Sequence, residues 1–193
     1  MELQHVNVKL LVNDPQGFDL ERLVPVFHAW IQDKAFGERL LDIADYRHVP
    51  EGPGVILIGH EGDYSVDNTD GRLGVRYNRK AALEGSNGDR LRQAARAALT
   101  ACQRLETEAS LGGKLRFNGQ DVEISINDRL LAPNDAATHK AAEPELRTFL
   151  DMLFRGAEYS LTYASEPRRL FGVAARAARP FSAEELLQNL ASH

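Results

Sequence analysis

The residues with the clearest chemical potential follow a short apolar stretch in the first third of the chain. Four consecutive aliphatic residues, 55–58, lie between two glycines and are followed by His60, Glu61 and Asp63. A continuous apolar run bounded by glycines is typical of a strand that is buried on both faces. Titratable side chains at the end of such a strand can serve acid–base or metal chemistry, so this cluster is the first candidate site.

A second carboxylate joins this cluster if the strand that ends at His60 forms a hairpin with residues 40–49. With Val49 opposite Gly54, Asp45 becomes a diagonal neighbour of His60 on the same face of the sheet. A carboxylate beside an imidazole orients the ring and raises its pKa, as a general base requires. The hairpin therefore predicts a contact between Asp45 and His60.

These four residues define one functional hypothesis, which is metal-assisted or acid–base hydrolysis of an anionic metabolite. His60 is the base, Asp45 orients it, Glu61 is an acid and Asp63 is a metal ligand, although the spacing matches no zinc motif. The alternative is that the cluster is a structural polar edge of the sheet. No complete catalytic motif occurs in the chain, so whether the protein is an enzyme stays open.

The charge distribution defines a second candidate site. Residues 51–70 contain five acidic side chains and no lysine or arginine, whereas residues 72–96 contain seven basic side chains. Arg76, Arg79 and Lys80 are the candidate ligand-binding residues, because they point towards a predicted helix N-terminus where phosphate or carboxylate is favoured.

Cross-strand ion pairs are the alternative explanation of the same pattern. If Asp70-Gly71 is a hairpin turn, Ser65 faces Arg76, and Asp63 and Asp67 flank Arg76 diagonally. These carboxylates would then neutralise the arginine without a ligand.

The predicted elements give an α+β fold, with a mainly antiparallel sheet and helices packed on it. Period-two and period-3.6 apolar patterns mark the strands and helices, and turn residues separate them. The predicted strands are 5–12, 40–49, 54–61, 64–67, 72–77, 122–126, 159–164 and 169–177, with a hairpin around Asn118-Gly119; the predicted helices begin near Asp19 or Pro25, after Gly88, near Pro144 and at Ser182.

The chain contains a weak internal similarity. Residues 8–14 resemble residues 122–128, and each segment is followed by a loop and an amphipathic helix. We therefore expect one compact domain over 1–193, built from two ferredoxin-like halves over 1–111 and 114–193. The alternative is that Asn-Asp commonly ends strands and that the match arose by chance.

Composition restricts the class of protein. The 193 residues carry a net charge of −5, which argues against a general nucleic-acid or membrane-surface binder. A single cysteine, Cys102, and the lack of a signal peptide favour the cytoplasm, and the excess of arginine and alanine is typical of a bacterial coding bias.

The favoured hypothesis is a non-catalytic cytoplasmic protein of binding or assembly. Its partner would be a small anionic ligand or another protein, and the cofactor, if any, is unknown. Formation of a homo-oligomer through an open sheet edge is a further alternative.

Overall fold

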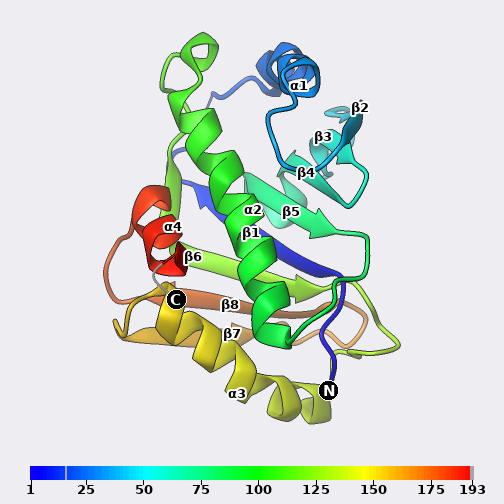
Figure 1. Ribbon diagram of the computed structural model, residues 1–193, viewed down its shortest axis with the longest axis vertical. Coiled ribbons are helices and arrows are strands. Elements are labelled where there is room, and N and C mark those ends of the chain that lie inside the picture. Colours follow the sequence, from blue (N-terminus) through cyan, green and yellow to red (C-terminus); the bar gives the residue numbers. More distant parts are fainter. Residues whose placement is uncertain (16, 192–193) are drawn as a thin grey trace.

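A computed structural model describes residues 1–15 and 17–191. Its eight strands form one antiparallel sheet in the order β2-β3-β4-β5-β1-β6-β8-β7 (Figure 1). The strands are β1 Val6–Val12, β2 Leu40–Tyr46, β3 Gly54–Gly59, β4 Gly62–Asp67, β5 Gly74–Arg79, β6 Phe117–Ile126, β7 Tyr159–Tyr163 and β8 Phe171–Ala177. The helices are α1 Leu23–Gln32, α2 Asn87–Thr107, α3 Ala136–Leu153 and α4 Ala183–Ala191. The predicted α+β class is confirmed.

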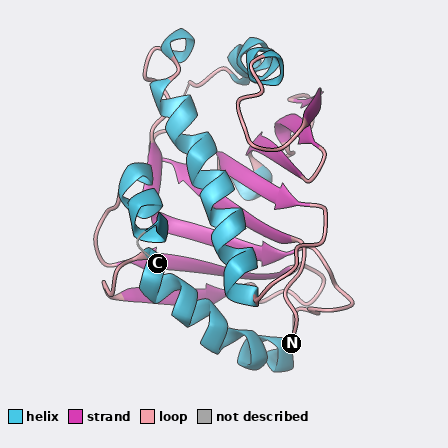
Figure 2. Ribbon diagram, viewed as in Figure 1, coloured by secondary structure: helices cyan, strands magenta, loops and turns pink. Residues whose placement is uncertain are grey.

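The α-helices cover one face of this sheet (Figure 2). Helix α2 crosses β1 and β5, and it also contacts α3 and α4. Alternation along β1 sends Val6, Val8, Leu10 and Val12 into the core beneath these helices. The core also contains Cys102, and burial raises the pKa of its thiol, which keeps it unreactive. None of the described helices is long and apolar enough to span a membrane.

The helix termini follow local sequence signals in most cases. Asp19 caps a short 3-10 turn ahead of α1, and Pro25 occupies the first turn of α1. A capping box is present at Ser182, where a helix was predicted to begin, because the Ser182 hydroxyl accepts a hydrogen bond from the Glu185 N–H and the Glu185 carboxylate accepts one from the Ser182 N–H. Helix α3, however, starts at Ala136 rather than near Pro144, since Asp135 caps it and Pro144 lies inside the helix.

Two predicted hairpins differ from the structure. In the first, residues 47–53 form the connection, so that Tyr46 rather than Val49 lies opposite Gly54. The second prediction, a hairpin around Asn118-Gly119, is wrong because β6 continues through these residues with a bulge opposite β1. A side chain at Gly119 would meet the Phe181 carbonyl oxygen at 2.5 Å, so this glycine permits a close approach of two chain segments.

Both predicted halves contribute to the same sheet. The two similar segments pair with each other in β1 and β6. Lys9 lies opposite Glu123, Val8 opposite Ile124 and Leu10 opposite Val122. The first half nevertheless has the order β-α-β-β-β-β-α and the second β-α-β-β-α. Neither order is β-α-β-β-α-β, so ferredoxin-like halves are not confirmed, and the duplication remains a prediction.

The N-terminus of α2 offers a direct test of local capping. The Ser86 hydroxyl accepts a hydrogen bond from the Asp89 N–H, and the Asp89 carboxylate accepts one from the Ser86 N–H at 2.9 Å. Replacing Ser86 with alanine should reduce the free energy of unfolding by about 1 kcal/mol, as measured by urea titration at pH 7.

The same cap should depend on pH. Hydrogen bonds from Ser86 lower the pKa of Asp89 to about 2. The contribution of this carboxylate is therefore complete above about pH 4 and is lost as the pH falls towards 2. An equal effect of Ser86→Ala at pH 7 and pH 2 would contradict this role of Asp89.

Candidate anion-binding site

The first predicted site lies at the turn between β3 and β4, where its acids are paired with bases. Glu61 forms an ion pair with Arg79 at 2.7 Å, and Asp63 forms one with Lys80 at 2.6 Å. His60 is exposed in the same turn. Two of the predicted ligand-binding bases therefore neutralise two of the predicted catalytic or metal-binding acids.

The predicted contact between Asp45 and His60 is wrong. Asp45 lies opposite Val55, at the far end of β3 from His60, because the turn over residues 47–53 shifts the register. The Asp45 carboxylate instead binds Arg47 at 2.8 Å, and hydrogen bonds from that arginine lower its pKa. The roles of His60 and Glu61 as acid–base residues stay predictions, without the orienting carboxylate.

Metal binding gains no support from this cluster. Among the described residues, no three or more histidine, cysteine, aspartate or glutamate side chains gather in a way that could hold a metal ion. Asp63 as a metal ligand stays a prediction.

The third predicted base, Arg76, lies in a different environment. As predicted, Ser65 lies opposite Arg76. Of the two flanking carboxylates, Asp67 binds Arg76, at 2.9 Å. Arg76 faces the side of the sheet opposite the helices, where it lines a hollow of about 580 Å³.

The floor of this hollow consists of polar and small side chains. Asn7 and Lys9 come from β1, on the strand face opposite its apolar residues. Ser125 on β6 lies opposite Gly172 on β8, and the neighbouring position on β8 is the small Ala174. The small residues of β8 leave the space that the hollow occupies.

Two hairpin loops reach over the floor from opposite ends of the sheet. The β4–β5 loop, 68–73, lies at the C-terminal end of β1, whereas the β7–β8 loop, 164–170, lies at its N-terminal end. An ion pair between Asp70 and Arg169 joins the two loops above the sheet. The hollow is therefore enclosed between the sheet and a bridge formed by side chains.

A buried amide holds the β7–β8 loop in place. The Asn134 side chain donates hydrogen bonds to the carbonyl oxygens of Ala164 at 3.0 Å and Glu166 at 2.8 Å. His139 on α3 in turn contacts the Asn134 carboxamide oxygen at 2.9 Å. Asn134 thus holds the loop through its side chain, and the adjacent Asp135 caps α3.

Positive charge dominates the lining. Six cationic side chains and two carboxylates line the hollow, in a chain whose net charge is −5. The cations are Lys9, Arg72, Arg76, Arg129, Arg168 and Arg169, and the carboxylates are Asp70 and Glu123. The lining therefore carries an excess of positive charge that the protein's overall composition does not explain.

Four of these cations have acidic partners within the protein. Asp67 binds both Lys9 and Arg76, while Arg72 pairs with Glu123 and Arg169 with Asp70. Arg129 and Arg168 form no ion pair with any described residue. These two arginines carry the charge that remains available to a ligand.

The pair of Lys9 and Asp67 lies at the base of the site and is fully buried. Lys9 is 2% exposed and Asp67 is 1% exposed, and their charged atoms lie 2.6 Å apart. Burial lowers the pKa of Lys9, against the opposing effect of the Asp67 carboxylate. Asp67 also accepts hydrogen bonds from the Thr69 N–H and hydroxyl, which fixes the start of the β4–β5 loop.

Three residues that line the hollow have a buried polar atom without a hydrogen-bond partner among the described residues, namely Asn7, Glu123 and Tyr163. Glu123 is ion-paired with Arg72, and the Tyr163 ring is stacked on His139. Asn7 is 6% exposed, and its carboxamide oxygen accepts no hydrogen bond from the described residues. An unsatisfied buried acceptor costs about 1–3 kcal/mol, and such groups are few in native proteins.

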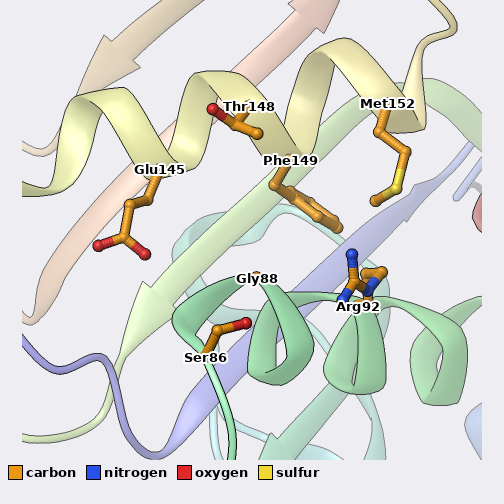
Figure 3. Close-up of a pocket in the computed structure, with 7 residues that line it drawn as sticks. All are labelled: Ser86, Gly88, Arg92, Glu145, Thr148, Phe149 and Met152. Atoms are coloured by element: carbon orange, nitrogen blue, oxygen red, sulfur yellow. The ribbon is translucent and has the colours of Figure 1, made fainter. Parts of the chain in front are cut away.

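A second cavity, of about 430 Å³, lies between α2 and α3 on the helical side (Figure 3). Phe149 and Met152 point into it from α3, and Arg92 faces them from α2. Its charged groups are already engaged, because Arg92 pairs with Asp89 and Glu145 accepts a hydrogen bond from Asn87 at 2.8 Å. This cavity carries no unpaired charge comparable to that of the hollow.

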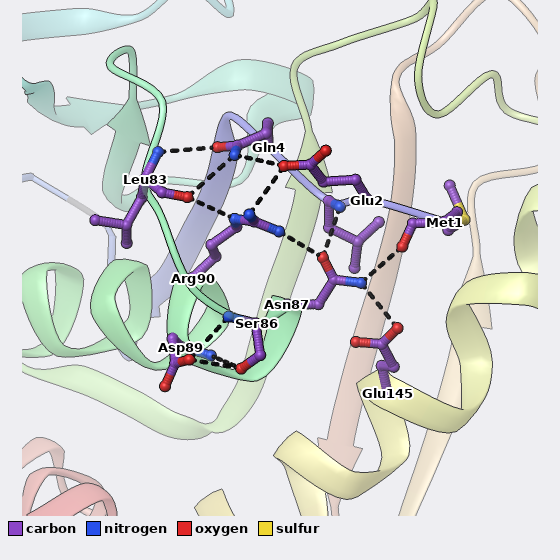
Figure 4. A network of polar contacts seen from close by, with 10 residues as sticks. Met1, Glu2, Gln4, Leu83, Ser86, Asn87, Asp89, Arg90 and Glu145 are labelled. Atoms are coloured by element: carbon purple, nitrogen blue, oxygen red, sulfur yellow. Dashed lines mark hydrogen bonds and ion pairs between the residues drawn. The ribbon is translucent and has the colours of Figure 1, made fainter.

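The neighbouring polar network explains how the N-terminal segment is fixed to α2 (Figure 4). Asn87 accepts a hydrogen bond from the Leu3 N–H and donates one to the Met1 carbonyl oxygen, each at 2.8 Å. Arg90 pairs with Glu2 at 2.9 Å and donates to the Leu83 carbonyl oxygen. These contacts are structural, since each polar group has a partner within the protein.

The hollow contains one predicted ligand-binding residue, Arg76, and several that the sequence did not single out. Arg168 and Arg169 beside Pro167 resemble a solvated turn, and Arg129 lies in a polar loop. The sequence feature that could have identified the floor of the hollow is the polar face of β1, where Asn7 and Lys9 alternate with apolar residues. No known family model and no curated protein matches this sequence.

Proposed function

We propose that the protein binds a small anionic ligand in the hollow on the open face of the sheet. The observation that carries this proposal is the presence of Arg129 and Arg168 without acidic partners in a lining that is already rich in cations. Guanidinium groups bind phosphate and carboxylate through two parallel hydrogen bonds, so they suit such a ligand.

The dimensions of the hollow also support a small molecule. Its volume of about 580 Å³ lies within the range of about 300–1,000 Å³ that is typical of ligand pockets. The partly enclosed position strengthens charge interactions relative to those at an open surface.

Anion binding should raise the thermal stability of the protein. At a concentration of 100 times Kd, a ligand specific for the folded state adds about 2.7 kcal/mol to the free energy of unfolding. Thermal unfolding should therefore be followed with inorganic phosphate at constant ionic strength, with chloride as the reference anion. Equal midpoints in phosphate and chloride would contradict the proposal.

Removal of the unpaired arginines should weaken this effect. Arg129→Gln and Arg168→Gln are each expected to reduce phosphate affinity by about 10- to 100-fold, because each removes charge-assisted hydrogen bonds. Arg155→Gln is the matched control, since Arg155 is also exposed but follows α3 on the helical side of the sheet. If Arg129→Gln and Arg168→Gln lost no more phosphate affinity than Arg155→Gln, the anion would bind outside the hollow.

A further inference from the structure

The arrangement of charges within the hollow separates an anion-binding end from a polar floor. Arg129 follows the C-terminal end of β6, and Arg168 precedes the N-terminal end of β8. These strand ends are adjacent, because Ile126 on β6 lies opposite Phe171 on β8. Both unpaired arginines therefore belong to the same end of the hollow.

The floor next to this end offers hydrogen-bonding groups. Asn7, Ser125 and Gly172 form one row across the three strands, and Lys9, Glu123 and Ala174 form the next. The unused carboxamide oxygen of Asn7 requires a hydrogen-bond donor. Hydroxyl groups supply such donors, whereas a carboxylate or the dianion of a phosphate monoester does not.

The lining offers no free aromatic surface. Tyr163 is the only aromatic residue among the described residues that line the hollow, and its ring is stacked on His139 with centroids 4.5 Å apart. Proteins commonly bind nucleobases by stacking them on aromatic or guanidinium planes. An aromatic ligand body would find no open ring here, and the arginines of the lining are engaged in ion pairs or assigned to the anion. A hydroxylated body, in contrast, matches the polar floor.

We infer that the ligand is a phosphate monoester of a sugar or polyol. This inference rests on the proposed function and adds the chemical class of the ligand. The phosphate, a dianion, lies between Arg129 and Arg168, and the hydroxylated body extends over Asn7, Ser125 and Glu123. Recognition combines the charge at one end with hydroxyl contacts along the floor.

Isothermal titration calorimetry with four probes tests this inference: glucose 6-phosphate, inorganic phosphate, phenyl phosphate and succinate. We expect glucose 6-phosphate to bind about tenfold or more tightly than inorganic phosphate. Phenyl phosphate, whose aromatic body has no hydroxyl group, and succinate should bind no more tightly than inorganic phosphate. Tighter binding of phenyl phosphate or succinate than of glucose 6-phosphate would overturn the ligand class and leave anion binding intact. If none of the four bound, the proposed function itself would fail.

Variants of Asn7 separate recognition of the body from recognition of the phosphate. Asn7→Ala should remove most of the preference for glucose 6-phosphate and leave the affinity for inorganic phosphate unchanged. Asn7→Ser, which retains a polar group, provides a second variant if the alanine variant is unstable. An unchanged preference in a folded Asn7 variant would overturn the proposed contact with the floor.

Discussion

Asp67→Ala is expected to lower the free energy of unfolding by about 3–5 kcal/mol, because it leaves a buried cation without its counterion. Asp67 is 1% exposed and binds Lys9 at 2.6 Å and Arg76 at 2.9 Å. Without this carboxylate, Lys9 either stays charged at a buried position beside other cations or loses its proton. Urea-induced unfolding, followed by circular dichroism at pH 7, measures the loss.

Two further variants test whether the unpaired charge of Lys9 causes this loss of stability. Asp121→Ala removes a more exposed carboxylate, which pairs with Arg176 at 2.6 Å, and it should cost about 1 kcal/mol or less. The double variant Lys9→Met/Asp67→Leu should recover most of the stability, since apolar replacement of a buried pair is commonly neutral. If the double variant were as unstable as Asp67→Ala alone, the unpaired charge would not be the cause.

Gly54→Ala should also destabilise the protein strongly, by about 3 kcal/mol or more, through strain and steric overlap together. Gly54 has a φ of 65°, which disfavours any side chain, and an added Cβ would lie 2.0 Å from the Val66 carbonyl oxygen. The β3–β4 pairing must therefore shift to admit the methyl group. Chemical denaturation reports the change in unfolding free energy.

Gly112→Ala is the control for the backbone strain. Gly112 has a similar φ of 62°, but an added Cβ there would meet no atom within 4 Å. This variant should lose only about 1–2 kcal/mol, so the difference between the two measures the close approach at Gly54. Equal losses of unfolding free energy in the two variants would show that the structure relieves the steric overlap at Gly54 without an energetic penalty.

The sequence predicted the fold class and most elements because their signals are local. Alternation identified β1, and the predicted helix starts after Gly88 and at Ser182 lie within two residues of the observed starts of α2 and α4. The prediction failed at Asn118-Gly119, where the signal of a tight turn coincides with a contact to Phe181 more than sixty residues away. No local pattern distinguishes these two uses of glycine.

The candidate site was harder to predict because its charges come from distant parts of the chain. Arg76 was identified from the charge pattern, but Arg79 and Lys80, where β5 ends, bind acids where the adjacent strand β4 begins. Arg129 and Arg168 lie in separate loops, and only the order of strands brings them to one end of the sheet. A sequence can show that these residues are charged, but not that they converge.

The central position of β1 has a consequence for the rates of folding and unfolding. Its two neighbours, β5 and β6, follow it by some sixty and more than one hundred residues, so these pairings close long loops and are slow to form. The hollow is bounded by β1, β5, β6 and β8 together, so it is complete only after these late steps. A bound anion should therefore prolong the lifetime of the folded protein by slowing unfolding, while leaving the rate of folding nearly unchanged.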